Sequence, residues 1–332
     1  MVDANPAGTT YILKAGTHRR QSVSPKDGDT FVGEPGTVLD GENSTDFAFR
    51  STSDNVTIRN VVVTRYASPS HYGAIEAVWD QTSGWVVEDC EVSYNLWAGI
   101  RIGHNGIVRR CHVHHNGEYG LGGTADNGLI EDNEVSYNNT GGHDPGFAAS
   151  GMKFMGSEGL VVRNNHVHHN WGKGIWYDGD HTGALIEGNL VEYNSNAGIE
   201  YEISFNAVIR NNTVRGGDGV GIAILNSPNV EVYNNVLDDN ENGIYGIDAN
   251  RGSGPFGARV LKDLWVHHNT IILPRGKSGI WGETSSTYTS KNNRFDHNTY
   301  TAHTNYPFWW KGGAVKWNVW QGDGQDPNGS FN

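Results

Sequence analysis

One phrase recurs in this chain at a fixed interval, and it restricts the fold more than any other feature. Residues 174–178 read Gly-Ile-Trp-Tyr-Asp, and 24 residues later positions 198–202 read Gly-Ile-Glu-Tyr-Glu. Further Gly-led segments of this kind start at Gly99, Gly120, Gly151, Gly221, Gly243 and Gly279. Repetition at such a period predicts identical structural units stacked on one another, each contacting only its neighbours.

Asparagine marks the same place in successive repeats. Asn165, Asn189, Asn212 and Asn235 follow one another at steps of 24, 23 and 23 residues. Three strands of about five residues at ~3.3 Å each, joined by turns, use this length, so each repeat is one coil of an all-β solenoid. Stacked coils let inward asparagines bond amide to amide, in a column that also holds Asn133, Asn269 and Asn298.

The two cysteines fall in the same column. We interpret Cys90 and Cys111 as buried substitutes for the ladder asparagines, with a disulfide across neighbouring coils as the alternative. Two cysteines are too few for a disulfide framework.

Composition supports a β solenoid and excludes several kinds of partner. The chain has 45 glycines and only 18% charged residues, which disfavours long amphipathic helices. A formal charge of −13 disfavours nucleic acid and anionic membranes as partners, and no apolar run reaches the ~20 residues of a membrane span. No linker interrupts the sequence, so we expect a monomer with one domain over 1–332, in which 1–45 form an N-terminal cap and first coils and 302–332 a C-terminal cap.

The chain resembles the right-handed parallel β-helix proteins of the pectate-lyase-like superfamily from about Gly8 to its end. The resemblance rests on turns such as "GLVVRNNHVHHN" and "AVIRNNTV" and on the opening "TTYILKAGTHRRQSVSPKDGDTFVGEPGTVLDG". It implies a right-handed parallel β-helix of roughly ten to twelve coils with three short strands per coil. Members are mostly polysaccharide lyases, hydrolases and epimerases, so it also implies a secreted or periplasmic protein, whose signal peptide the given sequence does not contain.

Alternation along the Gly-led strands assigns side chains to the two faces of a sheet. Ile175 and Tyr177, like Ile199 and Tyr201, should point into the core. The outward positions then form one column with Lys153, Trp176 and Glu200 and a second column with Met155, Asp178 and Glu202. Asp178 and Glu202 are therefore expected on adjacent strands ~5 Å apart.

Four carboxylates gather on these outward positions, and we call Asp178, Asp180, Glu200 and Glu202 the acid cluster. Like charges stacked in register destabilise a sheet, so a chain without use for them could carry Thr or Asn instead. We interpret the acid cluster beside Lys153 as a working site, in which Asp178, Glu202 and Lys153 are the catalytic residues.

Groups expected to bind substrate surround this cluster. A surplus of residues at 139–150 predicts a loop that brings His143 and Asp144 to the site, and residues 248–262 predict a second wall. Aromatic platforms suit sugar rings. The remaining substrate-binding candidates are Trp176, Trp97, Trp281, Arg101, Glu200 and Asp180. The histidines of the repeated "VHHN" turns are interpreted as turn residues rather than metal ligands.

Three functions are compatible with these residues, all with a polysaccharide or oligosaccharide as partner. Hydrolysis needs two carboxyl groups, one protonated and one charged, and Asp178 and Glu202 meet that requirement. We favour this function because acids outnumber bases in the expected groove.

A polysaccharide lyase is the alternative, with Lys153 as base and Ca²⁺ held by Asp178, Asp180, Glu200 and Glu202. In related lyases an Arg or Lys accompanies the calcium, and Arg101 lies in the column of Lys153 but two coils away. The Asp-Pro-His motif of related epimerases is absent, because residues 143–146 read His-Asp-Pro-Gly. The third function is a glycan-binding β-helix without catalysis.

Overall fold

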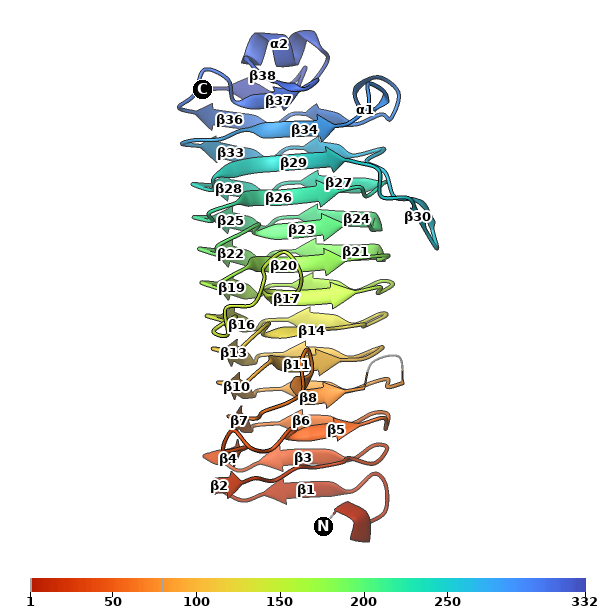
Figure 1. Cartoon of the computed structure of the whole chain (residues 1–332), viewed down its shortest axis with the longest axis vertical. Helices are drawn as coiled ribbons and strands as arrows, with labels where there is room; N and C mark the ends of the chain where they lie inside the picture. Colours follow the sequence, from red (N-terminus) through yellow and green to blue (C-terminus); the bar gives the residue numbers. More distant parts are fainter. Residues whose placement is uncertain (1, 79–80) are drawn as a thin grey trace. The chain divides into compact units, whose positions relative to one another are not determined.

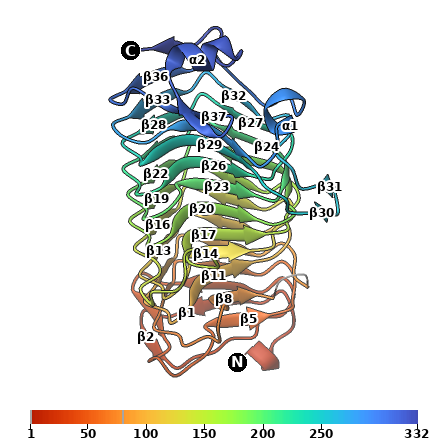
Figure 2. The same cartoon turned by 45° about the horizontal axis from the view of Figure 1, so that its top comes forward.

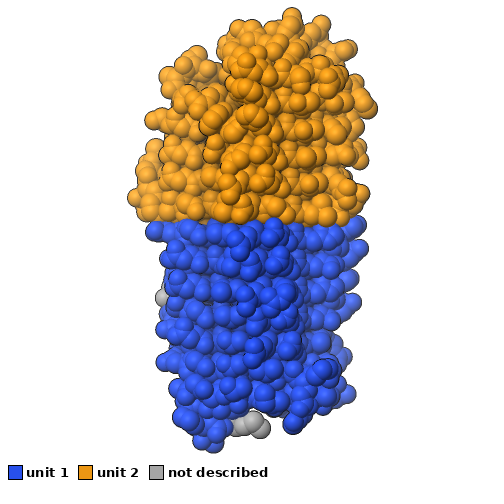
Figure 3. All heavy atoms as spheres, turned by 180° about the vertical axis from the view of Figure 1, so that it is seen from behind, with its two compact units in different colours: residues 1–172 blue, residues 173–332 orange. Residues whose placement is uncertain are grey.

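The computed structural model describes residues 2–78 and 81–332, which divide into two compact units, Met1–Gly172 and Lys173–Asn332 (Figure 3). Each unit is built from three parallel β-sheets whose strands alternate along the chain (Figure 1). The prediction of one domain over 1–332 stays a prediction.

In unit 1 the first sheet runs β1 (Thr10–Leu13), β3 (Thr30–Gly33), β6 (Thr57–Arg59), β9 (Val86–Glu88), β12 (Ile107–Arg109), β15 (Leu129–Glu131) and β18 (Val161–Arg163). The second sheet runs β2 (Gly16–Arg19), β4 (Thr37–Asp40), β7 (Val62–Thr64), β10 (Glu91–Ser93), β13 (His112–His114), β16 (Glu134–Ser136) and β19 (His166–His168). The third sheet runs β5 (Phe49–Ser51), β8 (Gly73–Ala77), β11 (Ala98–Ile102), β14 (Leu121–Gly123) and β17 (Ser150–Met155). A 3-10 turn, Val2–Ala4, precedes them.

In unit 2 the first sheet runs β21 (Thr182–Glu187), β24 (Phe205–Arg210), β27 (Val230–Tyr233), β32 (Trp265–His267) and β35 (Arg294–Asp296). The second sheet runs β22 (Leu190–Glu192), β25 (Thr213–Arg215), β28 (Val236–Asp238), β33 (Thr270–Leu273), β36 (Thr299–Ala302) and β39 (Ser330–Phe331). The third sheet runs β20 (Lys173–Asp178), β23 (Ile199–Glu202), β26 (Val220–Leu225), β29 (Asn242–Asp248), β34 (Ser278–Gly282), β37 (Phe308–Trp310) and β38 (Gly313–Val315). The last strand, β38, is the exception to the parallel order, because it pairs antiparallel with β37.

Three smaller features complete unit 2. A hairpin of β30 (Ser253–Gly254) and β31 (Gly257–Ala258) projects between β29 and β32, and α1 (Ser286–Thr289) follows β34. Near the end of the chain, α2 (Trp317–Gly322) buries Trp320 completely. No helix in residues 2–78 and 81–332 has the length and apolar character needed to cross a membrane.

The third sheet of unit 2 confirms the predicted alternation. Ile175 pairs in register with Ile199, and Tyr177 with Tyr201, and all four side chains are completely buried. The strands β20, β23, β26 and β29 follow one another in parallel (Figure 2). The repeated apolar residues therefore hold the core, as the sequence predicts.

The predicted asparagine ladder is present. In unit 2 the side-chain amide of Asn212 donates to that of Asn235 at 3.0 Å, and the ladder continues through Asn269 and Asn298 to Asp326. In unit 1 the Asn133 amide donates to Asn165 at 2.9 Å. A second ladder, not predicted, joins Asn95, Asn116, Asn138 and Asn170.

The cysteines lie at the expected place. Cys90 and Cys111 are both buried and both free thiols, and the backbone N–H of Cys111 donates to the side-chain oxygen of Asn133 at 3.0 Å. Cys111 thus continues the ladder position, and the alternative of a disulfide is wrong.

A left-handed residue precedes each ladder position and turns the chain from the first sheet to the second. In unit 2 this residue is Gly188, Asn211, Asn234, His268 or His297, with φ between 54° and 65°. Gly, Asn and His tolerate this region better than β-branched residues do. The local sequence therefore encodes the corner, and the asparagine that follows satisfies the buried backbone there.

Candidate functional site

The acid cluster lies on the outward positions of β20 and β23 and in the turn that follows β20. Asp178 and Glu202 are register partners, as predicted, and both side chains are partly exposed. Trp281 lies in the same column, because Glu202 pairs with Leu225, Leu225 with Ile247, and Ile247 with Trp281. Trp281 is 40% exposed.

Glu200 is the most unusual member of the cluster. Its side chain is almost completely buried, and its carboxylate lies 3.1 Å from Nζ of Lys173, which is also buried. Burial raises the pKa of Glu200 to about 7, and the neighbouring Glu202 adds to this rise, while Lys173 opposes it. Glu200 therefore exchanges a proton near neutral pH, which is frequent at functional sites.

Two arginines cover the acid cluster. They belong to residues 249–260, which contain the hairpin β30–β31 and which we call the strap. Arg251 Nη1 lies 3.0 Å from Glu202 Oε1, and Arg259 binds Asp180 with two hydrogen bonds of 3.1 and 2.6 Å. The expected wall at 248–262 is therefore present. Besides bordering the acid cluster, it brings two positively charged side chains to the carboxylates.

The calcium expectation stays a prediction. The carboxylates of Asp180, Glu200 and Glu202 face Arg259, Lys173 and Arg251, respectively. Residues 2–78 and 81–332 contain no group of three or more His, Cys, Asp or Glu side chains placed to hold a metal ion. In this structure cations of the protein are therefore the partners of these three carboxylates.

Trp176 is not the aromatic platform that the sequence predicts. Its ring is only 2% exposed, and Lys173 Nζ lies 3.1 Å from the ring centroid. Trp176 is also the register partner of Glu200. It packs under a cation and lines the buried side of the acid cluster, where a sugar cannot stack on it.

Lys153, Arg101, Trp97, His143 and Asp144 all belong to unit 1. Arg101 pairs with Gly122 and Gly122 with Lys153, which confirms their common column. Both cations are buried: Arg101 Nη1 lies 3.5 Å from Glu76, and Lys153 Nζ donates to the main-chain oxygen of Phe147. Asp144 makes a local hydrogen bond within its loop, because its Oδ1 accepts the N–H of Gly146 at 2.8 Å.

The remaining two residues of this group contact each other. His143 stacks on Trp97 with ring centroids 4.4 Å apart and an interplanar angle of 21°. Beside them lie residues that the sequence analysis missed. His71 Nδ1 is 2.6 Å from a carboxylate oxygen of Glu118, which is completely buried. No repeat connects these two residues in the sequence, so periodicity gave no signal for them.

Glu76 is a second carboxyl group that titrates near neutrality. It is completely buried in unit 1, and burial raises its pKa to about 7, while Arg101 opposes the rise. The N–H of Gly73 donates to its Oε2 at 2.8 Å.

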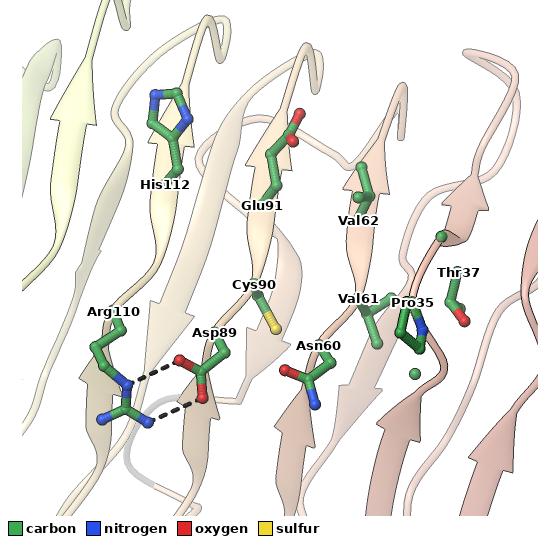
Figure 4. Close-up of a pocket in the computed structure, with 12 residues that line it drawn as sticks. Pro35, Thr37, Asn60, Val61, Val62, Asp89, Cys90, Glu91, Arg110 and His112 are labelled. Atoms are coloured by element: carbon green, nitrogen blue, oxygen red, sulfur yellow. Dashed lines mark hydrogen bonds and ion pairs between the residues drawn. The ribbon is translucent and has the colours of Figure 1, made fainter.

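A hollow of about 630 Å³ lies elsewhere on unit 1, where the first sheet turns into the second (Figure 4). Its charged side chains include Arg110 and Asp89, joined by hydrogen bonds of 2.8 and 2.9 Å. Arg110 also contacts Glu88 at 3.0 Å. The hydrogen bonds from Arg110 lower the pKa of Asp89, so this carboxyl group stays deprotonated and offers no proton donor of the kind that Glu200 provides.

Comparison with known proteins identifies the family. The family described as right-handed beta helix region matches residues 73–237 and 177–314. No curated protein matches the sequence significantly.

Solved structures with the same fold include the A-module of mannuronan C-5 epimerase AlgE6 from Azotobacter vinelandii, at 17% identity and a TM-score of 0.70, covering 100% of this chain and 91% of that one. Alginate lyase AlyF-OU02 in complex with G6 is 14% identical with a TM-score of 0.66, covering 89% and 74%. The GH87 alpha-1,3-glucanase from Streptomyces thermodiastaticus strain HF3-3 is 15% identical with a TM-score of 0.56, covering 91% and 54%. With the family match over most of its length, this chain belongs to the right-handed β-helix family.

Proposed function

We propose that this β-helix acts on a polysaccharide and hydrolyses its glycosidic bonds at the acid cluster. Support for the substrate class comes from the similar structures, which include an epimerase, a lyase and a glucanase. At these identities the likeness concerns the fold, so the chemistry is argued from the side chains.

The observation that carries the proposal is the different environment of two carboxyl groups on one strand. Glu200 is buried and has a pKa of about 7, so it still carries a proton near neutral pH. Glu202, two residues later on the same face, is ion-paired with Arg251. Hydrolysis of a glycoside requires one carboxylic acid and one carboxylate at the scissile bond.

In the proposed reaction Glu200 donates its proton to the leaving glycosidic oxygen as the C–O bond breaks. Asp178 and Glu202, in register on adjacent strands, supply negative charge for the developing oxocarbenium ion. One of these two carboxylates either deprotonates the attacking water or attacks the anomeric carbon before water does. Lys173 holds Glu200 in place at 3.1 Å.

The test is turnover on a panel of neutral and acidic polysaccharides. Glu200→Gln should lower kcat by about 100-fold or more, which is the usual contribution of a general acid. Glu187→Gln is the matched control, because Glu187 is also paired with an arginine in unit 2, Arg210, but on the first sheet. The control should keep full activity.

The products distinguish the functions. New reducing ends without absorbance near 235 nm support hydrolysis. Absorbance near 235 nm from an unsaturated product would contradict it and indicate a lyase, and full activity of Glu200→Gln would place the reaction elsewhere.

A further inference from the structure

Five residues of unit 1 converge beside the third sheet, and we call them the His71 cluster: His71, Trp97, Glu118, His143 and Phe147. His71, Trp97 and Glu118 lie shortly before β8, β11 and β14, and the last two lie in the loop before β17. They therefore meet at the same end of four successive coils. The acid cluster, in unit 2, contains none of them.

The relation between Glu118 and His71 is that of a buried carboxylate orienting an imidazole. Glu118 is completely buried, one of its oxygens lies 2.6 Å from His71 Nδ1, and the other has no hydrogen-bond partner among the described residues. A carboxylate at Nδ1 keeps the proton there, so Nε2 is left as an acceptor. The His71 side chain is 49% exposed, and its Nε2 is available to a ligand.

The main chain of His71 is held by two side chains from the following coils. Tyr119 Oη and Arg101 Nη1 each donate to its main-chain oxygen at 3.0 Å. The backbone itself is left-handed, with φ of 68°, as at many corner residues of this chain. These two hydrogen bonds fix the place from which the imidazole projects.

Aromatic rings surround the imidazole. The ring centroid of His71 lies 5.5 Å from that of Trp97 and 5.8 Å from that of Phe147, both at steep angles. Trp97 is supported from one side by His143. Phe147 is 66% exposed, which is unusual for a phenylalanine.

We propose that the His71 cluster is a second carbohydrate site, which binds a neutral sugar ring. The apolar face of the sugar stacks on Phe147, and one sugar hydroxyl donates to His71 Nε2. A neutral sugar fits because the nearest cations are already engaged: Arg101 with Glu76 and His71, and Lys153 with the main chain of Phe147. This site is independent of hydrolysis at the acid cluster.

The test is calorimetric titration of the Glu200→Gln chain with neutral hexasaccharides of β-1,4-glucose, β-1,3-glucose and β-1,4-mannose, and with a guluronate hexamer for comparison. At least one neutral hexasaccharide should bind. Phe147→Ala and His71→Ala should each weaken that binding at least fivefold. Trp171→Ala is the matched control, because Trp171 is an equally exposed aromatic residue of unit 1 outside the cluster, and binding should not change.

Glu118 is argued to act through His71, so its variants separate a positioning role from a structural one. Glu118→Gln keeps an oxygen that accepts from Nδ1 and should retain binding, whereas Glu118→Leu should lose it. Melting temperatures of all variants show whether they fold, and Phe147→Ala removes only an exposed ring.

Three outcomes would overturn the proposal: no neutral hexasaccharide binds, binding is indifferent to Phe147 and His71, or only the guluronate hexamer binds. Binding is measured in the Glu200→Gln chain and does not depend on turnover. These outcomes can therefore be interpreted even if the proposed hydrolysis is wrong.

Discussion

Glu200 combines burial, a lysine partner and a second carboxyl group on one strand, and its protonation should control the pH dependence of activity. Its pKa of about 7 lies well above the ordinary value of a glutamate. A general acid acts only while protonated, so kcat/KM should decrease as pH rises through about 7, approaching tenfold per pH unit.

The pH profile is measured between pH 5 and 9 on a soluble oligosaccharide. Glu187→Gln should show the same decrease as the native chain. Activity that stays constant from pH 6 to 9 would mean that Glu200 is not the acid.

A second single-residue prediction concerns Asp326, which ends the asparagine ladder of unit 2. One of its oxygens accepts from Asn298, and the other accepts from Tyr300 Oη at 2.8 Å and Trp320 Nε1 at 2.9 Å. In Asp326→Asn an amide nitrogen cannot accept those two bonds and leaves buried donors unsatisfied. The free energy of unfolding should fall by about 2–4 kcal/mol.

Urea denaturation measures this loss. Asp323→Asn is the control, because Asp323 lies on the surface and pairs with the exposed Lys311. Its substitution should change the free energy of unfolding by less than about 1 kcal/mol. Equal effects of both variants would contradict the assigned role of Asp326.

At the scale of the structural element, the ladder predicts that a buried asparagine contributes more to the free energy of unfolding than an exposed asparagine does. Asn212 accepts from Asn189, donates to Asn235, and also donates to the main-chain oxygen of Ile186. Its Oδ1 also accepts the main-chain N–H of Asn189 at 3.0 Å. Asn212→Ala removes all four side-chain bonds in a buried position and should lower the free energy of unfolding by about 2–4 kcal/mol.

The matched control is Asn206→Gly, since Asn206 is also a stacked asparagine of unit 2 but an exposed one. Glycine keeps its left-handed backbone, with φ of 52° in the native chain. Chemical denaturation should give a loss of less than about 1 kcal/mol. A larger effect at the surface site than at Asn212 would refute the ladder as a source of stability.

The sequence predicts elements through periodicity, and it does so because core and ladder positions repeat. The register of Asp178 with Glu202, the inward Ile and Tyr residues and the asparagine column all follow from the step between coils. The burial of Trp176 does not, because alternation assigns a face of the sheet but does not say what covers that face. Here Lys173 covers the ring.

The His71–Glu118 contact escaped prediction for a related reason. The two residues are 47 positions apart and lie outside the strands, in segments whose lengths differ from coil to coil. Such contacts depend on how individual loops fold against a sheet. They are visible only once side chains have positions in space.

At the scale of the whole molecule, histidine columns should set the response to acid. Burial lowers the pKa of His114 and His168 in unit 1 and of His267 in unit 2. Neighbouring histidines lower these pKa values further. Nearby glutamates raise them: Glu91 for His114, Glu134 for His168 and Glu231 for His267. At these three histidines the unfolded chain therefore binds more protons than the folded one below the ordinary histidine pKa of about 6.5. Their contribution to the free energy of unfolding should decrease as pH falls below that value, whereas Glu76 and Glu200, whose pKa values are raised to about 7, contribute in the opposite direction.

The measurement is urea denaturation at pH 7.5 and pH 5.5. Serine occupies the register positions next to these histidines, because Ser136 pairs with both His114 and His168. The double variant His114→Ser with His168→Ser should therefore fold and lose less stability between the two pH values. An unchanged loss would assign the acid response to other groups.

The strap and the loop before β17 have a consequence for the evolution of such a chain. Both are additions placed between strands, and the pairing across each is kept: β27 still pairs with β32, and β16 with β19. The charge and shape of a ligand site can therefore change when one connection between strands becomes longer, while the strands that carry the site keep their pairing.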